Sequence, residues 1–182
     1  GATAHKEGKF ENAELFYKRA LEFDKSHADS LHLLGLLLHQ KGQHKRAAHL
    51  LKKALLIKPD ELNYHVNLAI ILNALSQWSE AEKICVSAIQ IEPKHAEAYN
   101  NLGRALMAQN KLSEAEAAYA KSIEYAPYNA SAQSNLGYLH MQQGNYQLAE
   151  RAFLQAIQID EKFLLAYSNL ATTYLAMNLL ER

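Results

Sequence analysis

The chain has 182 residues, of which 29 are alanine and 29 are leucine, but only two are valine and three are threonine. Alanine and leucine favour helices and β-branched residues favour strands, so the composition predicts an all-α protein and excludes a many-stranded sandwich or barrel. Nineteen basic residues balance nineteen acidic ones. This balance argues against the long-range positive field of a protein that binds nucleic acid or an anionic membrane.

The sequence repeats itself at an interval of 34 residues. The three prolines, Pro59, Pro93 and Pro127, lie at this interval. Three further sets of positions share it: a leucine followed by a small residue, an invariant alanine, and a bulky residue four positions after that alanine. These are Leu34-Gly35, Leu68-Ala69, Leu102-Gly103, Leu136-Gly137 and Leu170-Ala171; Ala13, Ala47, Ala81, Ala115 and Ala149; and Tyr17, Leu51, Cys85, Tyr119 and Phe153. A fixed period of this length indicates a repeat architecture.

In chain order, the period predicts a single array. It comprises a partial repeat at 1–27, full repeats at 28–61, 62–95, 96–129 and 130–163, and a partial repeat at 164–182. Each full repeat is expected to hold two helices, because two stripes of apolar and small residues occur at helical spacing on either side of a break. The break falls on Gly8, Gly42, Ser76, Asn110, Gly144 and Asn178, mostly residues that tolerate left-handed backbone. The prolines are expected to end the second helices.

This pattern, seen best in Tyr99-Asn-Asn-Leu-Gly103, Ala115, Tyr119 and Pro127, resembles the tetratricopeptide repeat family over the whole chain. The departures are local: Lys25 and Glu161 replace the proline, and His65 and Gln133 replace the large aromatic residue. The resemblance implies a right-handed α-solenoid, a superhelix of 34-residue antiparallel helix pairs. It also implies that the first helices line a concave groove that binds peptide segments of partner proteins.

One side of each first helix carries none of the packing residues, and we call it the free face. On a helical wheel Asn100, Asn101 and Arg104 lie opposite Leu102 and Leu106. The same position in successive repeats gives the asparagine ladder: Asn67, Asn101, Asn135 and Asn169. A carboxamide both donates and accepts, so it can pair with a peptide backbone whatever the peptide's side chains. The alternative is that asparagine is common at this family position and is simply solvated.

The predicted peptide-binding residues all lie on the free faces. They are Asn67, Asn101, Asn135, Asn169, Asn63, Asn100, Arg104, Tyr138, His32, Leu36 and Ile70. Leu33 interrupts the ladder in repeat 28–61, and Leu36, Val66 and Ile70 make that end apolar. We therefore expect a partner with a hydrophobic anchor at one end. The alternative is that a capping segment or a neighbouring chain covers these side chains.

Several other functions are disfavoured by the same positions. Family members that grip acidic C-termini use lysine, asparagine and arginine. The equivalent places here are His32, Leu36, Asn67, Glu97 and Asn101, without lysine or arginine. RNA-reading repeats are also disfavoured, since the free faces have almost no positive charge beyond Arg104. The basic residues between Lys41 and Lys53 fall mainly on a second helix, where they indicate a solvated outer face or, alternatively, a site for an acidic partner or anionic surface.

No catalytic, cofactor or metal site is predicted. Phosphate-binding glycine loops, zinc-protease helices and serine-nucleophile turns are missing from the sequence. His32, His39, His44 and His49 are separated by seven, five and five residues, not by the three or four that place two ligands on one helix face. Cys85 occupies a packing position and is expected to be a buried small hydrophobe. As a lone cysteine it also fits a reducing compartment, so a cytoplasmic location is favoured.

The partial repeat 164–182 predicts a first helix with no second helix to cover it. Leu170, Tyr174, Leu175, Leu179 and Leu180 would then be partly open, which predicts self-association or a longer array. The longest apolar stretch, around 33–38, is far below the ~20 residues that span a bilayer, so membrane insertion is not expected.

The leading functional prediction is a non-catalytic protein-interaction scaffold. One alternative is the substrate-recognition region of a larger multidomain enzyme, and another is assembly of a complex through the outer faces. An asparagine ladder is also a feature of the repeat region of O-linked N-acetylglucosamine transferases, where the repeats choose substrates and a separate domain performs the chemistry. That similarity makes a glycosyltransferase the favoured enzyme.

Overall fold

The computed structural model describes residues 10–180, with side chains described for 12–178. Residues 10–180 form ten α-helices and no strand. The helices are α2 (Phe10–Phe23), α3 (Ala28–Gln40), α4 (His44–Ile57), α5 (Leu62–Ala74), α6 (Trp78–Ile91), α7 (Ala96–Ala108), α8 (Leu112–Tyr125), α9 (Ala130–Gln142), α10 (Tyr146–Ile159) and α11 (Leu164–Leu180). The prediction of an all-α fold made of helix pairs is confirmed.

The helices begin at the same place in every repeat. First helices start at residues 28, 62, 96, 130 and 164, and second helices start at 10, 44, 78, 112 and 146. Three first helices have a side-chain cap: His27, His95 and Asn129 each accept a hydrogen bond from the backbone N–H three residues later. Two of the nine histidines therefore satisfy backbone donors at helix starts.

The breaks between the paired helices are left-handed turns, as predicted. Gly42, Ser76, Asn110 and Gly144 all have positive φ, between 58° and 76°. The N–H of the next residue donates a hydrogen bond to the carbonyl five residues earlier and so closes each helix. An example is the bond from the Gln77 N–H to the Leu72 carbonyl at 2.9 Å. This is the hydrogen-bond pattern of a Schellman motif.

The predicted break differs at the two ends of the chain. Gly8 lies outside the described residues. The break predicted at Asn178 is wrong, because α11 continues through it to Leu180. The two residues after Asn178, Leu179 and Leu180, are strong helix formers and continue the helix.

Prolines mark the ends of the second helices. Helices α4, α6 and α8 end at Ile57, Ile91 and Tyr125, each two residues before a proline. Helix α10 ends at the equivalent Ile159 although Glu161 replaces the proline there. A proline is therefore not required at this position to end the second helix; at α10 the Asp160 N–H closes the last turn on the Ala156 carbonyl.

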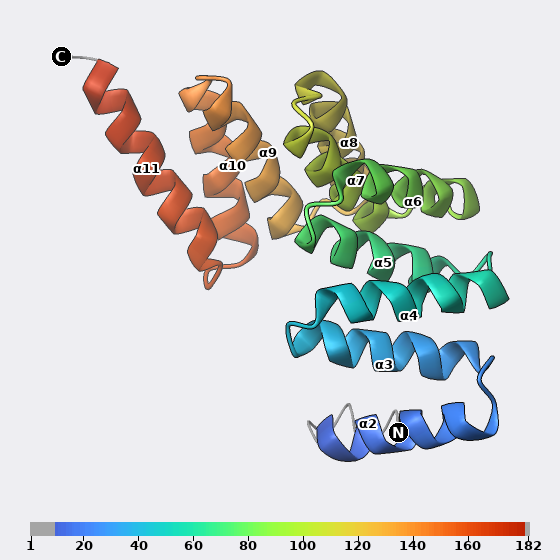
Figure 1. The fold of residues 1–182 in the computed structure, drawn as a ribbon. Helices are drawn as coiled ribbons and strands as arrows, with labels where there is room; N and C mark the ends of the chain where they lie inside the picture. Colours follow the sequence, from blue (N-terminus) through green and yellow to red (C-terminus); the bar gives the residue numbers. More distant parts are fainter. Residues whose placement is uncertain (1–9, 181–182) are drawn as a thin grey trace. The chain divides into compact units, whose positions relative to one another are not determined.

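The chain divides into two compact units, residues 1–93 and 94–182. In the first, helices α2 to α5 lie side by side in chain order and α6 packs on α5 (Figure 1). In the second, each of the helices α7 to α11 packs on its neighbour in the chain, and α9 also contacts α7 and α11. Each unit thus stacks helix pairs, the arrangement of an α-solenoid. No helix among the described residues is long and apolar enough to cross a membrane.

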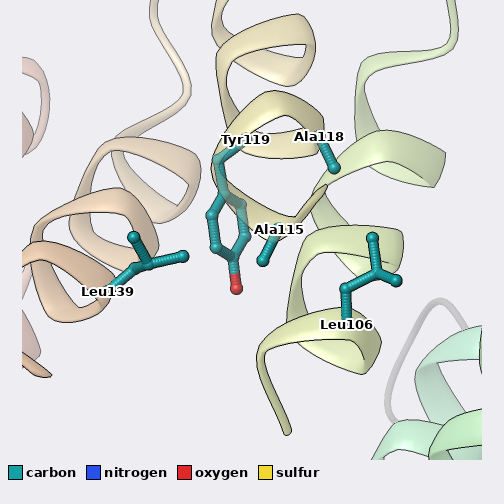
Figure 2. Close-up of a cluster of buried hydrophobic side chains, with 5 residues drawn as sticks. All are labelled: Leu106, Ala115, Ala118, Tyr119 and Leu139. Carbon is teal, nitrogen blue, oxygen red and sulfur yellow. The ribbon is translucent and has the colours of Figure 1, made fainter. Parts of the chain in front are cut away.

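Small and large residues complement each other in the core. Figure 2 shows Tyr119 of α8 packed among Leu106, Ala115, Ala118 and Leu139. A Cβ added at Gly103 would lie 2.5 Å from Tyr119 Cε1, and one at Gly137 would lie 2.8 Å from Phe153 Cε1. Repeat 62–95 instead has Ala69 and the smaller Cys85 at these two positions, both fully buried.

Candidate peptide-binding faces

In the first unit a polar network joins the free faces of α3 and α5 to the buried Tyr64 and to Lys58, which follows α4. The Tyr64 hydroxyl donates to Asp29 Oδ1, and Lys58 Nζ lies 3.0 Å from the same oxygen. The His32 ring stacks on the Tyr64 ring with 4.5 Å between centroids. Asn67 Nδ2 lies 2.9 Å from His32 Nε2, so the ladder asparagine of α5 is joined to α3.

Electrostatics keep this network in one protonation state near neutral pH. Burial lowers the pKa of His32, with smaller opposing effects from Asp29 and Glu61. The hydrogen bonds from Tyr64 and Lys58 lower the pKa of Asp29. His32 is therefore neutral, and its Nε2 accepts the Asn67 N–H in the tautomer that carries its proton on Nδ1.

An apolar strip lies on the same faces. Leu33 and Leu36 of α3 and Ile70 of α5 are half-buried, while Val66 is buried. Asn63, near the start of α5, is exposed. The three half-buried side chains could contact an apolar group of a partner.

The second unit repeats the asparagine contact. Asn135 Nδ2 of α9 donates to Asn100 Oδ1 of α7 at 2.9 Å. Asn101 is only 3% exposed, and its amide donates to the Glu97 carbonyl one turn earlier. Arg104, Tyr138 and Asn169 are half-buried, and Thr172 is exposed.

The predicted site residues therefore fall into two groups. Those with side-chain surface available to a ligand are Asn63, Asn67, Asn135, Asn169, Arg104, Tyr138, Leu36 and Ile70. His32, Asn100 and Asn101 are buried. The contacts of His32 and Asn100 with the next first helix were not predicted. The interval of 35 residues shared by Asp29–Tyr64, His32–Asn67 and Asn100–Asn135 is a signal that could have revealed them.

A histidine pair was also missed. His39 and His44 are five residues apart, yet the turn at Gly42 brings their Nδ1 atoms to 2.9 Å. Burial, and then the charge of His44, lower the pKa of His39. No group of three or more histidine, cysteine, aspartate or glutamate side chains in the described part of the chain could hold a metal ion.

Cys85 of α6 is buried, as predicted from its packing position. It has no exposed surface, and burial raises the pKa of its thiol to about 12. The thiolate that attacks an electrophile or binds a metal is therefore scarce at neutral pH.

Each unit stacks helix pairs and presents polar and apolar side chains on its free faces. This is the architecture of an α-solenoid, a class of repeat protein that binds other proteins along its surface. Comparison with protein families specifies it further. A model of anaphase-promoting complex, cyclosome, subunit 3 matches residues 6–88, and two tetratricopeptide repeat models match 60–127 and 100–162. The chain belongs to the tetratricopeptide repeat family.

Solved structures share the fold. YrrB, described as a TPR protein with an unusual peptide-binding site, is 26% identical over 92% of this chain and 86% of its own, with a TM-score of 0.74. A crystal structure of MamA is 24% identical over 88% of this chain and 94% of its own, with a TM-score of 0.77. A thermophilic TPR protein of Thermus thermophilus, TTC0263, is 18% identical over 96% and 95%, with a TM-score of 0.79. No curated protein matches the chain significantly in sequence.

Proposed function

We propose that the protein is a non-catalytic scaffold that binds an extended peptide or partner segment in the concave groove expected along the free faces of its first helices. The half-buried ladder asparagines carry this proposal. A carboxamide has two N–H donors and one acceptor, and the bond from Asn135 to Asn100 uses a single donor. The second N–H and the carbonyl oxygen of Asn135 remain for a ligand. Because the bond to Asn100 holds the Asn135 side chain in place, the entropic cost of binding is lower.

The spacing of the repeats suits an extended ligand. Adjacent packed helices lie about 8–10 Å apart, and an extended chain rises about 3.3 Å per residue. A ladder asparagine would therefore meet a peptide amide at about every third residue. In the first unit, Leu33, Leu36 and Ile70 would receive an apolar side chain of a ligand bound there.

The test is the affinity of peptides selected from a library of short random sequences on the immobilised protein. Replacing Asn135 and Asn169 with alanine should weaken their binding about tenfold, the loss expected from two hydrogen bonds of ~0.7 kcal/mol each. Asn12→Ala is the matched control, because this exposed asparagine lies on α2, a second helix. Unchanged affinity in the double variant, with helicity preserved in circular dichroism, would contradict the proposal.

The alternative keeps the binding function and places it within a larger enzyme whose catalytic domain lies outside these residues. It remains a prediction from the resemblance to glycosyltransferase repeat regions. Reading the sequence beyond Arg182 distinguishes the two.

A further inference from the structure

A pocket lies among α2, α3 and α4 in the first unit, and we call it the outer pocket. Its floor is apolar, formed by Leu34 and Leu38 of α3 and Leu50 of α4. Its rim is basic, formed by Lys18 of α2 and by Lys45, Arg46 and His49 of α4. The cavity volume is about 410 Å³, which exceeds the volume of a single leucine or phenylalanine side chain.

The outer pocket is separate from the peptide-binding faces. Leu34 and Leu38 are four residues apart and share one side of α3. Leu36 lies two residues from each, a rotation of about 200° at ~100° per residue, and therefore on the opposite side of the helix. A ligand in the outer pocket would leave the free face of α3 open.

The cations at the rim are unusual for their place in the repeat. Lys45 and Arg46 lie in the first turn of α4, where the helix dipole disfavours positive charge. The equivalent positions hold Ser79-Glu80 in α6, Ser113-Glu114 in α8 and Gln147-Leu148 in α10. Helix α4 thus carries two cations where α6 and α8 carry an acid that suits the dipole.

The basic rim is only partly neutralised by the protein. Lys18 lies 2.6 Å from Glu14, but Arg46 donates to the uncharged Gln43 Oε1 at 2.6 Å. No acidic side chain within residues 12–178 pairs with Lys45 or Arg46. The pocket therefore combines an apolar floor with positive charge on its α4 side that no described acidic side chain neutralises.

We propose that the outer pocket binds an acidic segment of a partner protein, with one bulky apolar side chain inserted between flanking carboxylates. The apolar side chain packs on Leu34, Leu38 and Leu50. Carboxylates on one side of it meet Lys45 and Arg46, and those on the other side meet Lys18. Charge complementarity and the size of the cavity select this occupant, and the site goes beyond the function proposed above because it uses a different face.

Fluorescence anisotropy with a fluorescein-labelled peptide of sequence DEDFDED tests the proposal. The wild-type protein should bind it saturably, and the double variant Lys45→Glu/Arg46→Glu should bind it at least about tenfold more weakly. Lys53→Glu/Lys83→Glu is the matched control: it makes the same change of charge at two exposed lysines outside the pocket and should leave the affinity within about twofold. Acidic residues in the first turn suit the dipole of α4, so the test variant should stay folded, and a thermal melt checks this.

Two further probes make the test decisive. The peptide DEDGDED lacks the apolar anchor and should bind at least about tenfold more weakly than DEDFDED. Three results would overturn the proposal. They are equal affinity for DEDFDED and DEDGDED, an equal loss of affinity in Lys45→Glu/Arg46→Glu and in Lys53→Glu/Lys83→Glu, and no saturable binding of DEDFDED to the wild-type protein. It would also fail if phosphatidylserine vesicles bound in place of the peptide and only vesicle binding were sensitive to Lys45→Glu/Arg46→Glu. Asn135→Ala should leave the affinity for DEDFDED unchanged. Failure of the outer-pocket proposal can therefore be told apart from failure of the groove-binding proposal.

Discussion

At the scale of residues, the close approach of Gly103 to Tyr119 sets how tightly paired helices pack. Gly103→Ala should destabilise the protein by about 1–3 kcal/mol, because the new methyl group overlaps the Tyr119 ring. Urea unfolding measures the loss.

Repeat 62–95 has Ala69 at the position of Gly103 and Cys85 at the position of Tyr119. A smaller residue at the second position should therefore make room for an alanine at the first and reduce the loss of stability. In the double variant Gly103→Ala/Tyr119→Cys, the alanine should cost about 1 kcal/mol less than it does beside tyrosine. Simple additivity of the two substitutions would contradict this explanation of the small and large positions.

Glu14 makes a pH-dependent link between α2 and the end of α3. Hydrogen bonds from Lys18 and Lys41, which lie 2.6 and 2.5 Å away, lower its pKa to about 2. The stabilisation is therefore present above the unfolded-state pKa of about 4.5 and is lost as the pH falls towards 2.

Glu14→Gln should lower the free energy of unfolding at pH 7 by no more than ~1 kcal/mol, since these are surface ion pairs. The difference from wild type should shrink as the pH falls from about 4.5 towards about 2 in urea titrations. A difference that did not change with pH would show that the carboxylate charge is not responsible.

The sequence alone predicted which residues lie on the free faces, but not how deeply they are buried there. A helical wheel treats each helix by itself, whereas the burial of Asn100 and His32 depends on a contact with the next first helix. That contact depends on how one helix pair is rotated against the next. Asn101 and Asn135 share a position in the repeat, yet Asn101 is buried and Asn135 is half-buried.

At the scale of elements, the helix bounds followed directly from the repeating positions. Left-handed turn residues and prolines are strong local signals, because few residues satisfy those backbone conformations. The exception is α11, where Asn178 alone does not break the helix. Another correction concerns Leu170: it was expected to be partly open, but it is buried against Ala149 and Phe153 of α10.

Ser76 is the least favourable of the four left-handed turn residues. It has φ of +58°, a conformation that costs a residue with a Cβ about 1 kcal/mol and that asparagine tolerates better. Ser76→Gly should therefore stabilise the protein by up to ~1 kcal/mol, and Asn110→Gly should do so by less. Thermal unfolding of the two variants compares them, and an equal or larger gain at Asn110 would argue against strain at Ser76.

At the scale of the whole molecule, α11 presents an apolar surface. Leu164, Leu165 and Leu175 are 79%, 55% and 67% exposed, and Tyr174 is 41% exposed, although its hydroxyl bonds to Glu150. The side chains of Leu179 and Leu180 lie outside the described residues. We predict that this surface drives self-association.

Light scattering at rising concentration should show an increasing mass for the wild-type chain. Leu175→Glu should reduce the increase, because it places a charge within the apolar surface. Leu154→Glu, at an exposed leucine on α10, is the control and should have no effect. A wild-type protein that stays monomeric at high concentration would contradict the prediction.

Recognition of a peptide by the ladder asparagines is the central claim, and side-chain amide NMR signals test it most directly. On titration with a peptide selected on the protein, the carboxamide signals of Asn67, Asn135 and Asn169 should shift saturably. The signal of Asn12 on α2 should stay in place. Shifts confined to residues of the second helices, with the ladder signals unchanged, would contradict the claim.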